Sequence, residues 1–150
     1  MFDYSTLITD RTQADVDAGN ERGTYDDRTL NRVTSAMEDL RARFSELGYI
    51  TGYEPLMIWH LNGSSDAVWR ENDEDIDADQ FNAYIANVSA LRGVLNMLSS
   101  TPQTPSTLEN LLYTQANDIE KILFDIDATL RRMASTFPVC GEALCGGDYL

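Results

Sequence analysis

Basic residues are scarce in this chain, and their scarcity excludes two classes of partner. Eleven Lys and Arg stand against 25 Asp and Glu, so the formal net charge is −14. A nucleic-acid-binding protein needs a basic stripe to displace counterions from phosphates, so nucleic acid is not expected as a partner. The same charge repels the chain from anionic membrane surfaces. The simplest interpretation of the acidic residues is a solvated surface.

Cysteine and histidine are equally rare, which argues against a zinc site. Cys140 and Cys145 are the only cysteines, with four residues between them, and no second pair completes a ligand set. A disulfide across this short loop is geometrically possible, but reduced thiols are expected for a protein assembled in the cytoplasm. His60, the only histidine, has no partner at ligand spacing and is expected to serve packing or solvent contact.

Catalytic and phosphate-binding motifs are also missing, so we predict no enzyme, no catalytic residues and no cofactor. The alternating acids of the Asp73–Asp79 loop are the feature most like a metal site, because calcium prefers oxygen ligands. An EF-hand loop beginning at Asp73 would need glycine and glutamate where the chain has Ala78 and Tyr84. Helix capping and solvation explain these acids without an ion, and no metal site is predicted.

Long hydrophobic runs are absent as well. Residues 1–11 have neither a basic n-region nor an apolar h-region, so no signal peptide is expected. No run approaches the length needed to span a bilayer. We therefore expect the protein to be made in the cytoplasm and kept there, or in a particle assembled there.

The chain does contain apolar residues at helical spacing. Spacings that alternate three and four predict three amphipathic helices at about residues 27–47, 78–98 and 107–134. The resulting fold class is mainly α, an antiparallel three-helix bundle within one domain, 1–150. Residues 1–25 are expected to form an N-terminal arm with a short helix, residues 26–136 the bundle, and residues 137–150 an extended C-terminal tail.

Capping residues support the helix ends. Thr12 and Asp15 form a capping box for the short helix, which is expected to end near Gly23. Residues 25–27 offer N-caps for the first long helix, and Gly48 is expected to end it in the left-handed conformation. Residues 106–109 form a capping box before the third long helix, after a linker at 99–105 that contains two prolines.

The insert between the first two long helices, residues 49–76, has a different character. Aromatic and β-branched residues surround the pair Asn62-Gly63, which predicts a β-hairpin or an ordered aromatic loop. Its aromatic residues either cover one end of the helical core or form an interface, and the pattern leaves both open. The candidate interface residues are Tyr49, Tyr53, Met57, Trp59 and Trp69, together with Phe137 and Tyr149 in the C-terminal tail.

Four stretches of the sequence resemble a known family. They are LITDRTQADV at 7–16, LNRV at 30–33, YIANVSALR at 84–92 and ANDIEKIL at 116–123. In this order, and with the tail around Cys140-Gly141-Glu142, they resemble small proteins encoded in the structural gene blocks of phages and prophages of Gram-positive gut bacteria. The chain departs from that pattern in a shorter region between residues 16 and 25 and a longer aromatic insert around residue 59.

The resemblance implies a virion component of the tail, baseplate or fibre-attachment region, made in the host cytoplasm. It brings no catalytic residues. The expected partners are other virion proteins and further copies of the chain in a symmetric homo-oligomer. Two alternatives remain open: a soluble acidic assembly chaperone or regulatory binding module that is not retained in the particle, and an enzyme with an oxygen-ligand metal site in the 73–79 loop.

Overall fold

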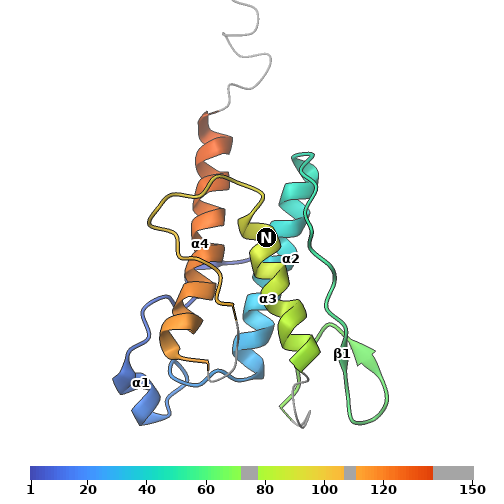
Figure 1. The fold of residues 1–150 in the computed structure, drawn as a ribbon, viewed down its shortest axis with the longest axis vertical. Coiled ribbons are helices and arrows are strands. Elements are labelled where there is room, and N and C mark those ends of the chain that lie inside the picture. The colour runs from blue at the N-terminus through green and yellow to red at the C-terminus, as the bar shows by residue number, and fades with distance from the viewer. Residues whose placement is uncertain (72–77, 107–110, 137–150) are drawn as a thin grey trace, which may run out of the picture.

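The computed structural model describes residues 1–71, 78–106 and 111–136 and shows a mainly helical chain with one small hairpin (Figure 1). The elements are a 3-10 turn η1 (Tyr4–Thr6) and helices α1 (Gln13–Ala18), α2 (Asp27–Glu46), α3 (Ala78–Arg92) and α4 (Tyr113–Thr136), with strands β1 (Ile58–Trp59) and β2 (Ser65–Asp66). The three long helices pack on one another, which confirms the predicted helical core.

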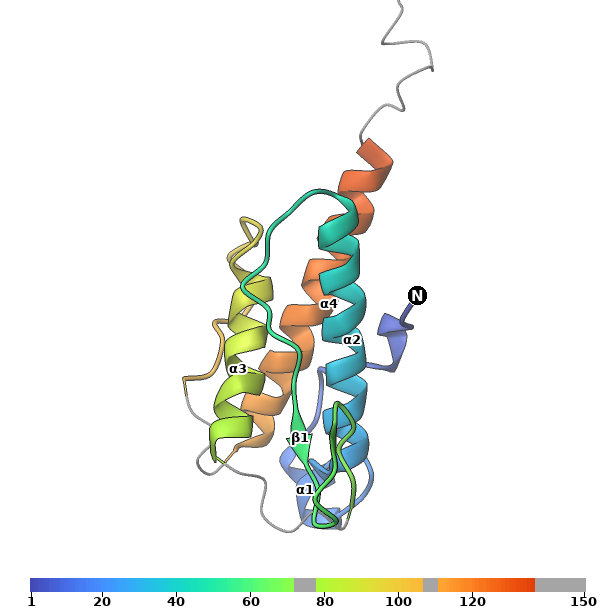
Figure 2. The ribbon, with the colours of Figure 1, turned by 90° about the vertical axis from the view of Figure 1, so that its right-hand side faces the viewer.

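All three long helices run in the same direction, whereas the sequence analysis predicted an antiparallel bundle. In Figures 1 and 2 the N-terminal ends of α2, α3 and α4 lie together at the bottom of the molecule. The length of the connections makes this arrangement possible. A helix of 20 residues such as α2 spans about 30 Å, which roughly ten extended residues can cover. The connections before α3 and α4 exceed that length, so the chain can return before each new helix begins.

Apolar residues at helical spacing place one face of each long helix in a common core. The fully buried members include Leu30, Leu40 and Phe44 of α2, Tyr84 and Leu91 of α3, and Ile119, Ile122, Leu123 and Ile126 of α4. Burial of one such side chain contributes about 1.5–3 kcal/mol. The core is therefore the main source of stability, and it matches the three predicted apolar stripes.

The caps of α2 agree with the sequence analysis. Asp26 accepts a hydrogen bond from the Thr29 N–H at 3.1 Å, and Gly48 has a φ of 81°. The Tyr49 N–H donates to the Phe44 carbonyl and the Gly48 N–H to the Ser45 carbonyl, which is the Schellman arrangement. The Tyr49 and Phe44 rings then meet edge to face at 5.7 Å. This turn reverses the chain and sends it back along the bundle.

Two helix ends differ from their predicted positions. α3 ends at Arg92 rather than near residue 98, and α4 begins at Tyr113 rather than near residue 107. Leu95 and Leu111 continue the helical spacing of apolar residues, but they pack against the core from non-helical backbone, as Val94 and Met97 also do. The Arg92 guanidinium donates to the Pro102 carbonyl at 2.7 Å and holds the 93–105 segment near the end of α3. The predicted capping box at 106–109 and the predicted tail at 137–150 lie largely or wholly outside the described residues.

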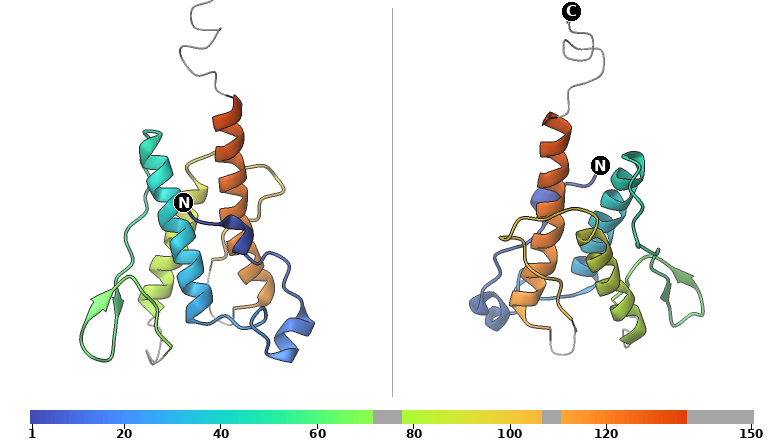
Figure 3. Two further views of the ribbon diagram at one scale, coloured as in Figure 1. Left: turned by 180° about the vertical axis from the view of Figure 1, so that it is seen from behind. Right: turned by 45° about the horizontal axis from the view of Figure 1, so that its top comes forward.

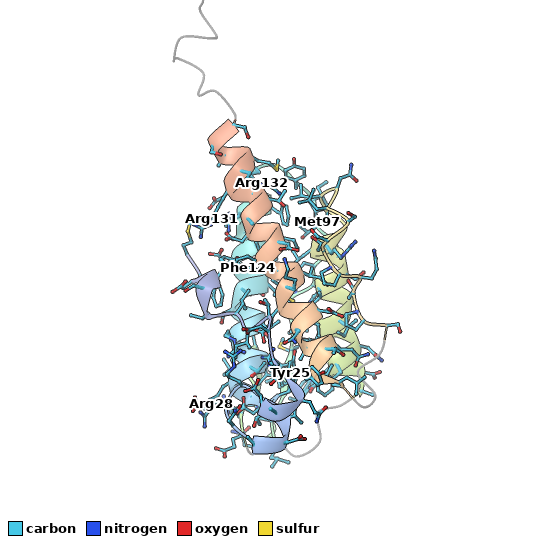
Figure 4. The ribbon with its side chains drawn as sticks, turned by 90° about the vertical axis from the view of Figure 1, so that its left-hand side faces the viewer. Tyr25, Arg28, Met97, Phe124, Arg131 and Arg132 are labelled. Atoms are coloured by element: carbon cyan, nitrogen blue, oxygen red, sulfur yellow. The ribbon has the colours of Figure 1, made fainter. Side chains whose placement is uncertain are left out.

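The N-terminal arm lies across α2 and α4, as the left view of Figure 3 and Figure 4 show. Its predicted capping box is present, because Thr12 and Asp15 each accept a hydrogen bond from the other's backbone N–H. α1 is shorter than predicted and ends at Ala18, since Gly19 takes up the left-handed conformation with a φ of 59°. In the described part of the chain, no helix has both the length and the apolar character needed to cross a membrane.

Candidate interaction surface

Burial alternates along the segment that returns from α2 to the hairpin. Tyr53, Leu56 and Ile58 point into the core, while Met57 and Trp59 point outward. Alternation of this kind follows from extended backbone, in which successive side chains leave on opposite faces. The sequence therefore places two large apolar side chains on one exposed face of the segment, with Trp59 at 65% and Met57 at 59% exposure.

The predicted hairpin around Asn62-Gly63 is present and short. Ile58 pairs with Asp66 and Trp59 with Ser65 in antiparallel register, and Gly63 has a φ of 78° at the turn. His60 is buried at the base of the turn, where its Nε2 lies 2.8 Å from Asp66 Oδ1. The pKa of the Asp66 carboxyl lies below its ordinary value, mainly because of this hydrogen bond. His60 thus has a local partner and a packing role, as the sequence analysis expected.

One asparagine from each long helix holds an extended segment against the bundle. The Asn87 side chain accepts from the Glu54 N–H at 2.9 Å and donates to the Glu54 carbonyl at 2.8 Å. Asn31 makes the same two bonds to Trp69, both at 2.8 Å. Asn117 makes them to Arg11, at 2.9 and 3.0 Å. We call this two-bond contact an asparagine clasp. It satisfies the backbone of a segment that has no neighbouring strand.

The seven candidate interface residues differ in how far they are exposed. Tyr53 and Trp69 are only 7% and 3% exposed and belong to the core. Of the two predicted roles, they therefore cover the helical core and do not form an interface. Their polar atoms are used internally, since the Tyr53 hydroxyl donates to Glu38 at 2.7 Å and the Trp69 Nε1 donates to Thr34 at 3.2 Å. Met57 and Trp59 are exposed. Tyr49 is partly engaged by Phe44. The two tail candidates, Phe137 and Tyr149, lie outside the described residues.

A groove runs between the return segment and the outer face of α3. Its volume is about 620 Å³. The lining residues come from positions 52–59 and from α3, where Asp79, Gln80, Ala83, Ala86 and Asn87 contribute. A second cavity of about 200 Å³ shares Ile58, Trp59 and Gln80 with it. The second cavity is also lined by Tyr25, Asp26, Asp27, Leu30, Trp69, Arg70 and Glu71. We call the surface formed by these two neighbouring cavities the Trp59 groove.

Carboxylates outnumber basic side chains in the lining of the Trp59 groove. Five carboxylates line it, and Arg70 is its only Lys or Arg among the described residues. The Arg70 guanidinium is engaged by Asp66 at 2.6 Å. Glu54 and Glu71 are exposed, and neither makes an ion pair within residues 1–71, 78–106 and 111–136. Apolar side chains and unneutralised carboxylates therefore share one surface.

A separate ionic cluster is buried between the N-terminal arm and the helices. Glu120 of α4 is fully buried and accepts from the Ile8 N–H at 2.7 Å and from Arg32 at 3.0 and 3.2 Å. It also pairs with Arg11, which is itself buried. Each polar group in this cluster has protein partners, and no buried side-chain N or O atom in the described part of the chain lacks one. The cluster ties the arm to the bundle.

The sequence analysis missed the asparagine clasps, the buried Glu120 and the small-residue face of α3 that lines the groove. A signal for the first two was present, since Asn is a weak helix former and a Glu within an apolar stripe needs a buried partner. Four of the five acids of the Asp73–Asp79 loop and both cysteines lie outside the described residues. Among the described residues, no group of three or more His, Cys, Asp or Glu could hold a metal ion.

Comparison with protein-family models, curated proteins and solved structures found no match. The geometry of the Trp59 groove is therefore the structural basis for interpreting this chain.

Proposed function

We propose that this chain is a non-enzymatic structural protein of a phage particle, in the tail, baseplate or fibre-attachment region. It acts through protein–protein contacts. The four sequence stretches that resemble phage structural proteins suggest the setting. The bundle supplies a rigid body, because its three long helices share one apolar core.

The observation that carries the proposal is the exposure of Trp59 and Met57 on the edge of a groove. Both sit on a segment held in place by the clasp of Asn87 on Glu54, so their exposure is built into a fixed backbone. Tryptophan and methionine are enriched at the buried centres of interfaces. A pre-positioned apolar surface also loses little conformational entropy when a partner covers it. Contact with another protein explains this arrangement.

Mass spectrometry of purified particles tests the proposal. We expect the chain in a fixed stoichiometry to the other virion proteins, in copies that reflect the symmetry of the particle. Light scattering on the purified chain should show self-association that increases with concentration. A chain that stays monomeric at high concentration and is missing from purified particles contradicts the proposal.

A second candidate is an acidic assembly chaperone that leaves before the particle is complete. The observation that favours it is the state of the basic residues, because nine of the eleven Lys and Arg pair with carboxylates of the same chain. The surface charge is thus left negative and suited to shielding a basic partner. Presence in infected cells combined with absence from particles distinguishes this candidate from a virion component.

A further inference from the structure

We propose that the Trp59 groove docks a basic amphipathic segment of a different protein. Apolar side chains of that segment would cover Trp59 and Met57, and its Lys or Arg side chains would face Glu54 and Glu71. The inference rests on the proposed function, since it states the chemistry of the partner through which a structural protein acts.

The shape of the groove fits a polypeptide segment. The two cavities are neighbours that share Ile58, Trp59 and Gln80 in their linings, so one segment of polypeptide that passes over Trp59 can reach both. Ala83 and Ala86 line the α3 side, and their small side chains let another backbone approach this helix closely. A surface that is long, open and floored by small residues is suited to an extended or helical segment.

The apolar part of the surface has a fixed geometry. Met57 and Trp59 are two positions apart in extended backbone, so both side chains leave from the same face. Ile58 between them is buried and anchors the strand in the core. The pair therefore presents one continuous apolar contact, and apolar contacts of this kind supply most of the binding free energy at interfaces.

The charges on the surface determine the sign of the partner. Glu54 borders the larger cavity and Glu71 the smaller one, and both side chains are exposed without an ion pair in the described residues. Arg70 does not offset them, because Asp66 holds its guanidinium at 2.6 Å. Complementary charge steers association and selects between partners. A segment with Lys or Arg spaced to reach both carboxylates fits this pattern.

Two other occupants, a second copy of this chain and the chain's own residues 137–150, have the wrong charge. A second copy of the chain offers few cations, since nine of its eleven Lys and Arg already pair with its own carboxylates. The chain's own residues 137–150 contain Glu142 and Asp148 and neither Lys nor Arg. Neither of these two occupants supplies the cations, and a basic segment of a different protein does.

Peptide titration with charge-matched variants tests this proposal. The full chain is titrated with a Leu/Lys peptide of about 18 residues, long enough to form a helix, and with a peptide that has Glu in place of each Lys. Fluorescence reports contact, because Trp59 is exposed and Trp69 is buried. The groove variant is Glu54→Lys with Glu71→Lys. The control variant is Asp17→Lys with Glu46→Lys, which changes the net charge equally, at α1 and at the end of α2.

We expect the Leu/Lys peptide to bind and to shift the tryptophan emission to shorter wavelength. The groove variant should bind about tenfold more weakly or worse, and the control variant should stay within about twofold of the natural chain. Trp59→Ala, at an exposed position, should also weaken binding and remove the emission shift. Equal weakening in the two double variants, or equal binding of the Leu/Glu peptide, overturns the proposal. Neither result bears on whether the chain is present in particles, so the two proposals can fail separately.

Discussion

Three asparagines hydrogen-bond the backbone of an extended segment through one side-chain amide each, as a neighbouring strand would in a sheet. They are Asn31, Asn87 and Asn117. Each satisfies the N–H and the carbonyl of one residue on an extended segment, at distances between 2.8 and 3.0 Å. Without these bonds the segments would lie against the helices with unsatisfied backbone groups. A helix interior is an unfavourable place for Asn, because its side chain competes with the backbone for hydrogen bonds. The clasp gives three such residues a structural role.

The clasp of Asn87 on Glu54 is expected to hold the return segment in place. Asn87→Ala removes both bonds at a buried position and leaves two backbone groups of Glu54 without their partners. We expect a loss of about 1–3 kcal/mol in the free energy of unfolding. Urea denaturation measures it, with Asn82→Ala on the exposed face of the same helix as control. Equal midpoints for the two variants contradict the clasp's contribution.

At the scale of elements, the sequence predicts what packs but not how the elements are connected in space. The stripe from Leu30 to Phe44 was assigned to a helix with nearly correct bounds, because each apolar position in it faces the core. The second predicted helix was extended too far, to residue 98, because Leu95 packs against the core from non-helical backbone, while Leu98 is 57% exposed. Periodicity reports burial, and burial does not require a helix.

The N-terminal arm is the element whose attachment depends most on one residue. Glu120→Gln keeps the size of the side chain but leaves the Arg11 guanidinium buried without its counter-charge. We expect a loss of about 3–5 kcal/mol in the free energy of unfolding. Trypsin should also cleave faster after Arg11 and Arg22. Glu21→Gln, which removes an exposed ion pair with Arg28, should cost less than about 1 kcal/mol. Similar effects of both substitutions contradict a role for the buried cluster.

At the scale of the whole molecule, three parallel helices place three helix N-termini at one end. Acids stand there, with Asp27 in the first turn of α2 and Asp79 in the first turn of α3. Arg43 and Arg92 stand in the last turns of the same helices. This distribution complements the aligned helix dipoles. Figure 4 shows Arg131 and Arg132 toward the C-terminal end of α4, whereas Arg28 lies at the opposite end of the molecule, where it pairs with Glu21 and Asp26. The antiparallel alternative was predicted because connection length permits either direction and apolar spacing contains no information on direction.

Three buried tyrosines and the partly buried Tyr25 make the whole fold sensitive to high pH. Burial is the main cause that raises the pKa of Tyr4, Tyr25, Tyr53 and Tyr84 above the ordinary value. A raised pKa in the folded state means that the phenol stays neutral there while the unfolded chain ionises. Stability should be complete below about pH 10, where tyrosine ionises in unfolded chains, and should fall as the pH rises further. Phenolate absorbance measures the ionisation of the tyrosines and circular dichroism measures the helix content, and both are followed as the pH is raised. Ionisation of these tyrosines near pH 10 with the helices intact contradicts this prediction.

Carboxylate-to-amine cross-linking of purified particles tests the central claim most directly, namely that the chain is a particle component that binds through the Trp59 groove. Lys121 is the only lysine among 150 residues, so couplings within the chain are few and links from its acids report lysines of other proteins. We predict couplings from Glu54 and Glu71 to a second virion protein. Particles without this chain contradict the proposed function, and couplings confined to acids outside the groove contradict the docking surface.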